Sequence, residues 1–125
     1  MTLESRVFQI TEYELVDTPE AFIAAISALA DRTEREGHGG VLGYQFYVDR
    51  ETLTAGAVIQ YADAAAWVAH HQMAYQWDEM PILQATVSLS RLTLFGPLNG
   101  ELEGWLDGAE FPIARFGGFA AGFIR

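Results

Sequence analysis

Residues 61–77, YADAAAWVAHHQMAYQW, decide how the rest of the chain is arranged. Asp63 can accept hydrogen bonds from free backbone N–H groups as the N-cap of a helix, and the alanines, glutamines and methionine that follow favour helix over strand. At about 100° per residue, the bulky side chains of this helix share one arc, which is expected to be buried, with His70 at its middle. The arc comprises Ala66, Trp67, His70, Met73, Ala74 and Trp77, with Gln72, Gln76 and Glu79 on the opposite side.

The segment before this stretch predicts a strand followed by a helix. Residues 7–15, VFQITEYEL, are rich in β-branched and aromatic side chains, as strands are. Thr18 and Pro19 then form a helix-start signal, as N-cap and first helical residue, and Gly37 predicts the end of the helix. One face of this helix is apolar: Phe22, Ala25, Ile26, Leu29 and Ala30.

Three further strands complete the pattern. Residues 41–48, VLGYQFYV, and about 52–61 form a hairpin, because each carries strand-type residues and a short polar turn joins them. The dipeptide at residues 80–81, Met-Pro, marks an end or a kink of the His70 helix. Residues 87–95, VSLSRLTLF, predict the fourth strand, which the following Gly-Pro ends.

The predicted element order is therefore β-α-β-β-α-β, the ferredoxin-like plan of the α+β class. In this plan an antiparallel sheet carries both helices on one face. We expect residues 1–106 to form this domain and residues 107–125 to form a C-terminal extension. The other sheet face also carries apolar residues, and two helices can cover only one face. A homodimer joined sheet to sheet is the simplest cover.

The C-terminal segment is expected to be ordered. Residues 111–125, FPIARFGGFAAGFIR, contain four phenylalanines, which disordered tails rarely carry. We expect Phe116, Phe119 and Phe123 to pack against the body or across the dimer.

Composition excludes several classes of function. The net charge of −10 repels nucleic acid backbones and anionic membrane surfaces, so neither is an expected partner. The absence of cysteine excludes disulfides, zinc ribbons, iron–sulfur clusters and thiol nucleophiles. The N-terminus lacks the pattern of a signal peptide, and no apolar run is long enough for a membrane span, so a cytoplasmic location is expected.

Three stretches together resemble a known family. They are VLGYQFYVD at residues 41–49, YADAAAWVAHH at 61–71 and SRLTLFGPLNGEL at 90–102. With the element order, they resemble the antibiotic biosynthesis monooxygenase-like group of the dimeric α+β barrel proteins, over residues 6–106. The resemblance implies a barrel of two sheets and a cavity between the sheet and helices of each subunit. It also implies cofactor-free oxygenation of phenols and quinols, or haem degradation.

Haem degradation is the less favoured of these activities. The haem-degrading branch resembles this chain in using a helix histidine and a nearby tryptophan, roles that Trp67 and His70 or His71 would fill. That branch also uses an asparagine on the first strand. The only asparagine here is Asn99, and the first strand offers Gln9 instead.

His70 is the candidate catalytic residue. Its ordinary pKa of about 6.5 suits a general base near neutral pH, and the alternative is a buried histidine with a purely structural hydrogen bond. His71 lies about 100° around the helix from His70, so the two cannot chelate one metal from a regular helix. We expect no metal and no cofactor. The candidate substrate-binding residues are Trp67, Tyr44, Tyr61, Met73, Trp77, Arg91 and Gln9.

Each binding candidate has a structural alternative. Trp67 and Trp77 would pack in the core, the tyrosines would be half-buried strand residues, and Arg91 would pair with Glu12 or Glu14. Two functional hypotheses follow. The first is a cofactor-independent monooxygenase that acts on a small aromatic ligand held between sheet and helices. The second is a non-catalytic dimeric module of the same fold that binds a small ligand or serves a structural role.

Overall fold

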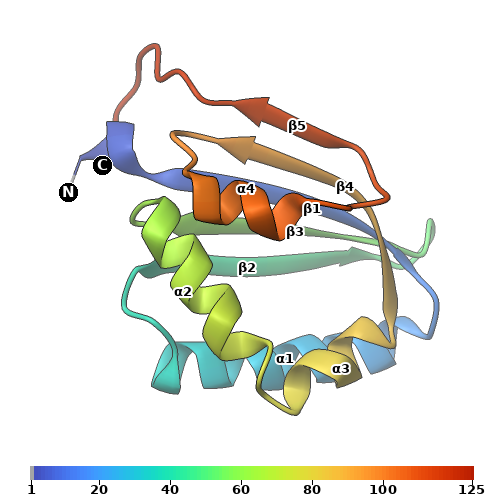
Figure 1. Ribbon diagram of the computed structural model, residues 1–125. Helices are drawn as coiled ribbons and strands as arrows, with labels where there is room; N and C mark the ends of the chain where they lie inside the picture. The colour runs from blue at the N-terminus through green and yellow to red at the C-terminus, as the bar shows by residue number, and fades with distance from the viewer. Residues whose placement is uncertain (1) are drawn as a thin grey trace.

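A five-stranded mixed sheet with helices against one face forms the body of the protein (Figure 1). The computed structural model describes residues 2–125. The strands are β1 (Val7–Leu15), β2 (Val41–Asp49), β3 (Thr54–Tyr61), β4 (Val87–Phe95) and β5 (Ile113–Phe116). The helices are α1 (Pro19–Glu36), α2 (Ala64–Ala74), α3 (Glu79–Gln84) and α4 (Gly100–Leu106), preceded by a 3-10 turn, Leu3–Ser5.

The strand order confirms the predicted ferredoxin-like α+β fold. The sheet runs β2-β3-β1-β4-β5, and the first four strands pair antiparallel. β5 then adds a parallel strand beside β4 at one edge. The structure thus contains the predicted β-α-β-β-α-β core, together with α3, α4 and β5, which extend it.

The two predicted helix starts form as expected. Thr18 caps α1, because its hydroxyl accepts a hydrogen bond from the N–H of Ala21 at 3.1 Å. Asp63 caps α2 in the same way through the N–H of Ala66, at 2.8 Å. Buried side chains of α1 then cover one half of the sheet: Phe22, Ala25, Ile26, Leu29 and Thr33.

The end of α2 differs from the prediction. The helix stops at Ala74, and the chain turns before the separate helix α3, which contains Pro81 in its first turn. Trp77 therefore lies in a turn and does not continue the helical arc. Ala64 and Val68 are buried as well, so the buried face of α2 lies nearer Trp67 and His71 than the sequence pattern indicated.

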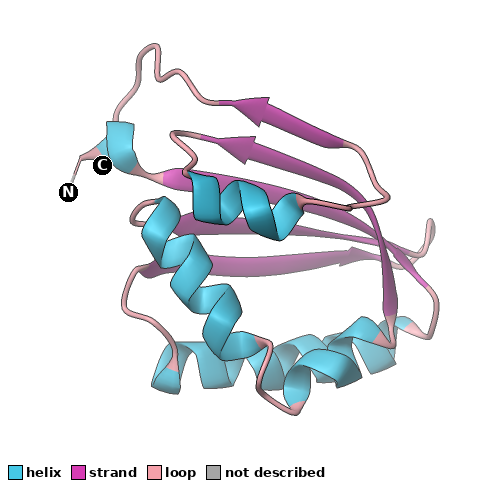
Figure 2. Cartoon of the chain, in the orientation of Figure 1, coloured by secondary structure: helices cyan, strands magenta, loops and turns pink. Residues whose placement is uncertain are grey.

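Burial differs sharply between the two faces of the sheet. The face under the helices holds both apolar core clusters, with Tyr61, Leu94 and Leu102 fully buried, and Figure 2 shows α1 to α4 gathered on that side. Within residues 2–125, no helix lies over the opposite face. It exposes a row of apolar side chains, from Tyr47 on β2 through Val58, Ile10 and Phe95 to Phe116 on β5.

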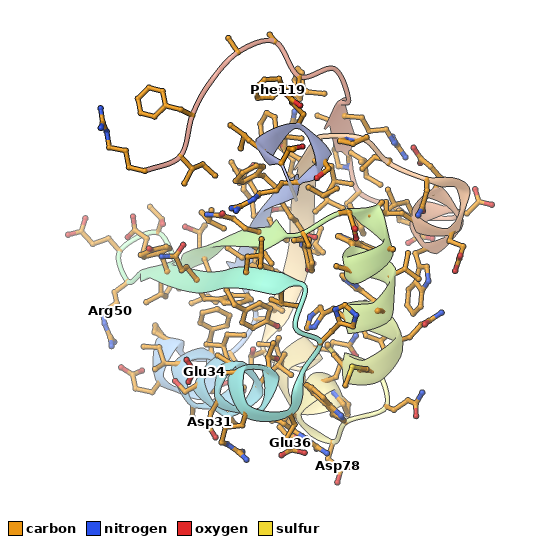
Figure 3. The ribbon with its side chains drawn as sticks, turned by 90° about the vertical axis from the view of Figure 1, so that its left-hand side faces the viewer. Asp31, Glu34, Glu36, Arg50, Asp78 and Phe119 are labelled. Atoms are coloured by element: carbon orange, nitrogen blue, oxygen red, sulfur yellow. The ribbon has the colours of Figure 1, made fainter. Side chains whose placement is uncertain are left out.

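The C-terminal segment follows the edge of the sheet. β5 pairs with β4, and Arg115 forms a two-pronged ion pair with Glu103 of α4, with N–O distances of 2.9 to 3.1 Å. Phe119 lies beyond β5, at the end of the molecule away from α1 (Figure 3). Phe116, Phe119 and Phe123 remain 58%, 44% and 75% exposed in the single chain. Their burial across a dimer stays a prediction.

Negative charge lies on the outer surface. Asp31, Glu34 and Glu36 are exposed in the second half of α1, at the end of the molecule opposite Phe119 (Figure 3). Within residues 2–125, no helix is both long and apolar enough to cross a membrane.

Replacing Gly96 by alanine should destabilise the protein by about 2 kcal/mol. Gly96 has a φ of 109°, and an added Cβ would collide with the backbone carbonyl oxygen of Arg6. Gly104→Ala in α4 is the matched control, because a Cβ there meets nothing within 4 Å and alanine favours a helix. Urea unfolding of both variants measures the difference. Equal stability of the two would contradict the close approach of Arg6.

Candidate functional site

A cavity of about 240 Å³ lies between the sheet and the helices. Side chains from β1, β2, β3, β4, α1, α2 and α3 line it. Its polar lining consists of four tyrosines, two histidines and two glutamines, without a charged side chain: Gln9, Tyr13, Tyr44, Tyr61, His70, His71, Tyr75 and Gln84. Tyr75 is 52% exposed, so the cavity opens to the surface beside the end of α2.

His70 contributes unpaired polar atoms to the cavity wall. The residue is only 3% exposed, and its Nδ1 is buried without a hydrogen-bond partner. The hydroxyl of Tyr61 is likewise buried and unpaired. The ring centroids of these two residues lie 5.9 Å apart, and that of Tyr44 lies 5.5 Å from His70. Because buried polar atoms are normally paired, these two atoms make the cavity the candidate functional site.

Burial keeps the groups of the cavity uncharged near neutral pH. Desolvation, together with the nearby His38, lowers the pKa of His70 to about 4. Burial raises the pKa of Tyr13 to about 12 and raises the pKa values of Tyr44 and Tyr61 above their ordinary range. His70 is therefore a neutral imidazole at pH 7, with one N–H and one lone pair.

His71 is the second histidine of the cavity, and the sequence pattern had placed it outside the arc. Its Nδ1 lies 2.7 Å from the carbonyl oxygen of Trp67, and its ring stacks on the Trp67 indole with centroids 3.6 Å apart. Burial lowers the pKa of His71 to about 3, although the hydrogen bond to the Trp67 carbonyl opposes this shift. The rotation of the buried face towards His71 explains why helical spacing alone missed it.

Trp67 holds two residues of the cavity wall, Gln9 and His71, in position. Its indole N–H donates to Oε1 of Gln9 at 2.7 Å, and Nε2 of Gln9 donates to the Thr11 hydroxyl at 2.8 Å. The indole is 3% exposed. Trp67 therefore holds Gln9 and the ring of His71 in place, while Gln9 itself lines the cavity.

The structure brings together His70, Tyr44, Tyr61 and Gln9 at the cavity, whereas three predicted binding residues lie elsewhere. Met73 and Trp77 line a shallow depression on the outer side of α2. Trp77 lies there because the helix has ended, and its ring packs under the guanidinium of Arg32, 4.7 Å from the ring centroid.

Arg91 is also far from the cavity. It lies 51% exposed on β4, with Nε 3.9 Å from the carboxylate of Glu12 on the neighbouring strand. The register shift in β4 opposite Glu12 and Tyr13 leaves Arg91 on the uncovered face. This geometry matches the ion-pair alternative that the sequence also offered.

A larger hollow of about 540 Å³ lies between the end of α1 and β2. It is lined by Asp31, Glu34, His38 and Leu42, and it shares Tyr44 with the cavity. This hollow is wide open to solvent. Within residues 2–125, none of the buried, unpaired polar atoms belongs to a residue that lines it. The smaller cavity at His70 is therefore the better candidate despite its size. Across the described residues, no cluster of three or more His, Asp or Glu side chains is placed to hold a metal ion.

Comparison with solved structures confirms the fold. No protein-family model and no curated protein sequence matches the chain. The crystal structure of MupZ from Pseudomonas fluorescens matches it with a TM-score of 0.74 and 21% identity, over 96% of this chain and 94% of MupZ. SnoaB, a cofactor-independent oxygenase from Streptomyces nogalater, matches with a TM-score of 0.59 and 14% identity, over 76% of this chain and 95% of SnoaB. This chain has the subunit fold of the dimeric α+β barrel proteins.

A third similar structure is a Caulobacter crescentus protein named for the antibiotic biosynthesis monooxygenases. Its TM-score is 0.59 and its identity is 16%, over 73% of this chain and 86% of that protein. The predicted resemblance to this group is therefore confirmed at the level of fold. The MupZ alignment leaves only a few residues of this chain unmatched, so it includes most of residues 107–125.

Proposed function

We propose that the protein is a cofactor-independent monooxygenase acting on a small hydroxylated aromatic compound in the cavity at His70. The observation that carries the proposal is the pair of buried, unpaired polar atoms, Nδ1 of His70 and the hydroxyl of Tyr61, at one cavity without charged side chains. A phenol hydroxyl both donates and accepts hydrogen bonds, so it can satisfy both groups at once.

Oxygenation of a phenol requires few protein groups: a base, a hydrogen-bond donor and a pocket that excludes water. An electron-rich phenolate reacts with oxygen directly once it is deprotonated and held in a dry pocket. Conversion of a ring C–H of the phenol to a quinone carbonyl places one oxygen atom in the product and releases the other as water. The substrate supplies all the electrons that reduce oxygen, so the atoms balance without an external reductant. The likeness to SnoaB, described as a cofactor-independent oxygenase, supports this reaction class.

The cavity limits the size of the substrate. An engineered cavity of roughly 150 Å³ binds benzene in another protein. A cavity of about 240 Å³ therefore suits a substituted single ring or two fused rings, and excludes larger polycyclic compounds unless side chains move. Tyr44, Phe46 and Ile59 supply flat or branched apolar walls for such rings.

Oxygen uptake tests the proposal. With a panel of one-ring and two-ring phenols and quinols, at least one compound should consume one molecule of oxygen for each quinone formed. The rate should scale with protein concentration and persist after exhaustive removal of metal ions.

The alternative function is a non-catalytic binding module. The lowered pKa values of His70 and His71 in the empty cavity favour it, because a weak base is a poor proton acceptor. Saturable binding of phenols without any oxygen uptake across the panel would select this alternative.

We further propose that two copies associate through their uncovered sheet faces, as predicted from the sequence. Val58, Ile10 and Phe95 are more than one third exposed on this face, and adjacent apolar side chains there favour association. Sedimentation should show a dimer at micromolar concentration, and Val58→Lys should shift it towards monomer. Gln72→Lys on the outer side of α2 is the control. A monomeric wild-type protein would contradict this assembly.

A further inference from the structure

The hydrogen bonding of His71 fixes which of its ring nitrogens carries the proton. Nδ1 lies 2.7 Å from the carbonyl oxygen of Trp67. A carbonyl oxygen only accepts hydrogen bonds, so Nδ1 must donate. A neutral imidazole has one N–H, and therefore Nε2 of His71 carries a lone pair. Within residues 2–125 this atom has no hydrogen-bond partner, and it is not fully buried.

The ring of His71 is also held in orientation. It stacks on Trp67 with an interplanar angle of 18°. Trp67 is anchored in turn through Gln9 to Thr11. His70 lacks such a restraint, since its buried Nδ1 has no partner. A proton acceptor is most effective when the direction of its lone pair is fixed before the substrate binds. His71 is therefore suited to accept a proton, and His70 to form a hydrogen bond with the ligand.

The cavity itself is electrically neutral. No carboxylate, lysine or arginine lines it, so a substrate that enters as an anion would find no opposite charge. The neutral phenol is the form that fits, and it must lose its proton inside. The titratable groups packed around His71 are His70, Tyr61 and Tyr75, with ring centroids 5.2, 6.3 and 5.8 Å from that of His71. Tyr44 on β2 and Tyr13 on β1 line the same cavity.

We infer that Nε2 of His71 accepts the hydroxyl proton of a bound neutral phenol, while His70 and Tyr61 donate hydrogen bonds to the phenolate oxygen that results. The inference rests on the proposed function and divides its acid–base work between the two histidines. The O–H bond of the substrate breaks, and the proton forms an N–H bond at Nε2. The electron pair stays on the phenolate oxygen, and the electron-rich phenolate can then react with molecular oxygen.

The surroundings stabilise both products of this transfer. The imidazolium of His71 keeps its hydrogen bond to the Trp67 carbonyl, which favours the charged form. The phenolate lies beside this new positive charge and receives the N–H of His70 and the O–H of Tyr61. In the empty cavity the bond to Trp67 is present but the phenolate charge is not, so burial outweighs this bond and lowers the pKa of His71, as it does that of His70.

The experiment uses 4-nitrophenol as a probe, because its absorption moves to longer wavelength when it ionises. Saturable binding to the full-length protein is measured first, and the ionised fraction of the bound probe is then followed against pH. His71→Gln should lower this fraction by roughly tenfold or more at neutral pH, since glutamine cannot take a proton. His70→Gln keeps a donor and should change it little, whereas His70→Leu should lower it.

His38→Gln is the matched control, because it makes the same exchange outside the cavity. His38 acts on the pKa of His70 but not on that of His71, so this variant should keep the ionised fraction nearly unchanged. Circular dichroism verifies the fold of each variant, and nitrogen NMR of the wild type should show His71 protonated at Nδ1 alone. Loss of ionisation in His70→Gln but not in His71→Gln would overturn the inference, as would failure of the probe to bind. These readouts need no turnover. A bound phenol that ionises through His71 yet takes up no oxygen would refute only the proposed monooxygenase.

Discussion

Lowering the pH from 7 to 5 should reduce the free energy of unfolding by about 2 kcal/mol for each of the two cavity histidines. In the folded protein burial holds the pKa of His70 at about 4 and that of His71 at about 3, whereas the unfolded chain has the ordinary value of about 6.5. Between these values the unfolded state binds more protons. The stability is therefore fully present above pH 6.5 and is lost as the pH falls towards the folded-state pKa values.

Urea unfolding at fixed protein concentration between pH 7 and pH 5 measures this loss. The range ends above the ordinary pKa values of aspartate and glutamate, so the carboxylates contribute little to it. His70→Gln should remove about half of the pH dependence. A free energy of unfolding that is constant between pH 7 and pH 5 would show that both imidazoles are solvated in the folded protein.

The main sheet was predictable because its strands are long and alternate regularly. In β3, Ala57, Ile59 and Tyr61 alternate with Val58 along the strand, and burial follows this alternation. The caps at Thr18 and Asp63 were equally clear, since each is a local hydrogen bond between residues close in sequence.

The edge of the fold was not predictable in the same way. Residues 113–116 become a strand because β4 offers an unpaired edge, so the cause lies in residues about 20 positions earlier. The helix α4 has only 7 residues, too few for a periodic pattern to indicate it. These short elements depend on tertiary contacts, which a single sequence does not reveal.

The candidate site was predicted only in part, for a physical reason that involves α2. Including Trp77 in the helical arc centred the pattern on His70 and drew in Met73. The actual helix ends three residues earlier, at Ala74, and His71 faces the cavity. Whether a space stays open between side chains depends on the packing of all its neighbours, so the cavity itself had no signature in the spacing.

Replacing His70 by leucine should lower the ionised fraction of a bound phenol and the rate of oxygen uptake, while leaving the protein at least as stable as the wild type. A structural histidine would lose a hydrogen bond on this exchange and destabilise the fold by about 1 to 3 kcal/mol. His70 has no such bond to lose, because its Nδ1 is buried and unpaired. Leucine of similar size removes this unsatisfied group, so an unchanged or higher free energy of unfolding is expected, by up to about 1 kcal/mol.

The effect on activity should be large. Loss of a group that contacts the reacting oxygen costs on the order of 10² to 10⁴ in rate, measured as kcat/KM with whichever phenol supports oxygen uptake. His71→Leu provides the contrast, since it breaks the hydrogen bond to Trp67 and the stacking on its indole and should lower stability by about 1 to 2 kcal/mol. If His70→Leu is the less stable of the two variants and its activity falls only with its folded fraction, then His70 is a core residue. The unpaired atoms at the cavity would then not mark a binding site.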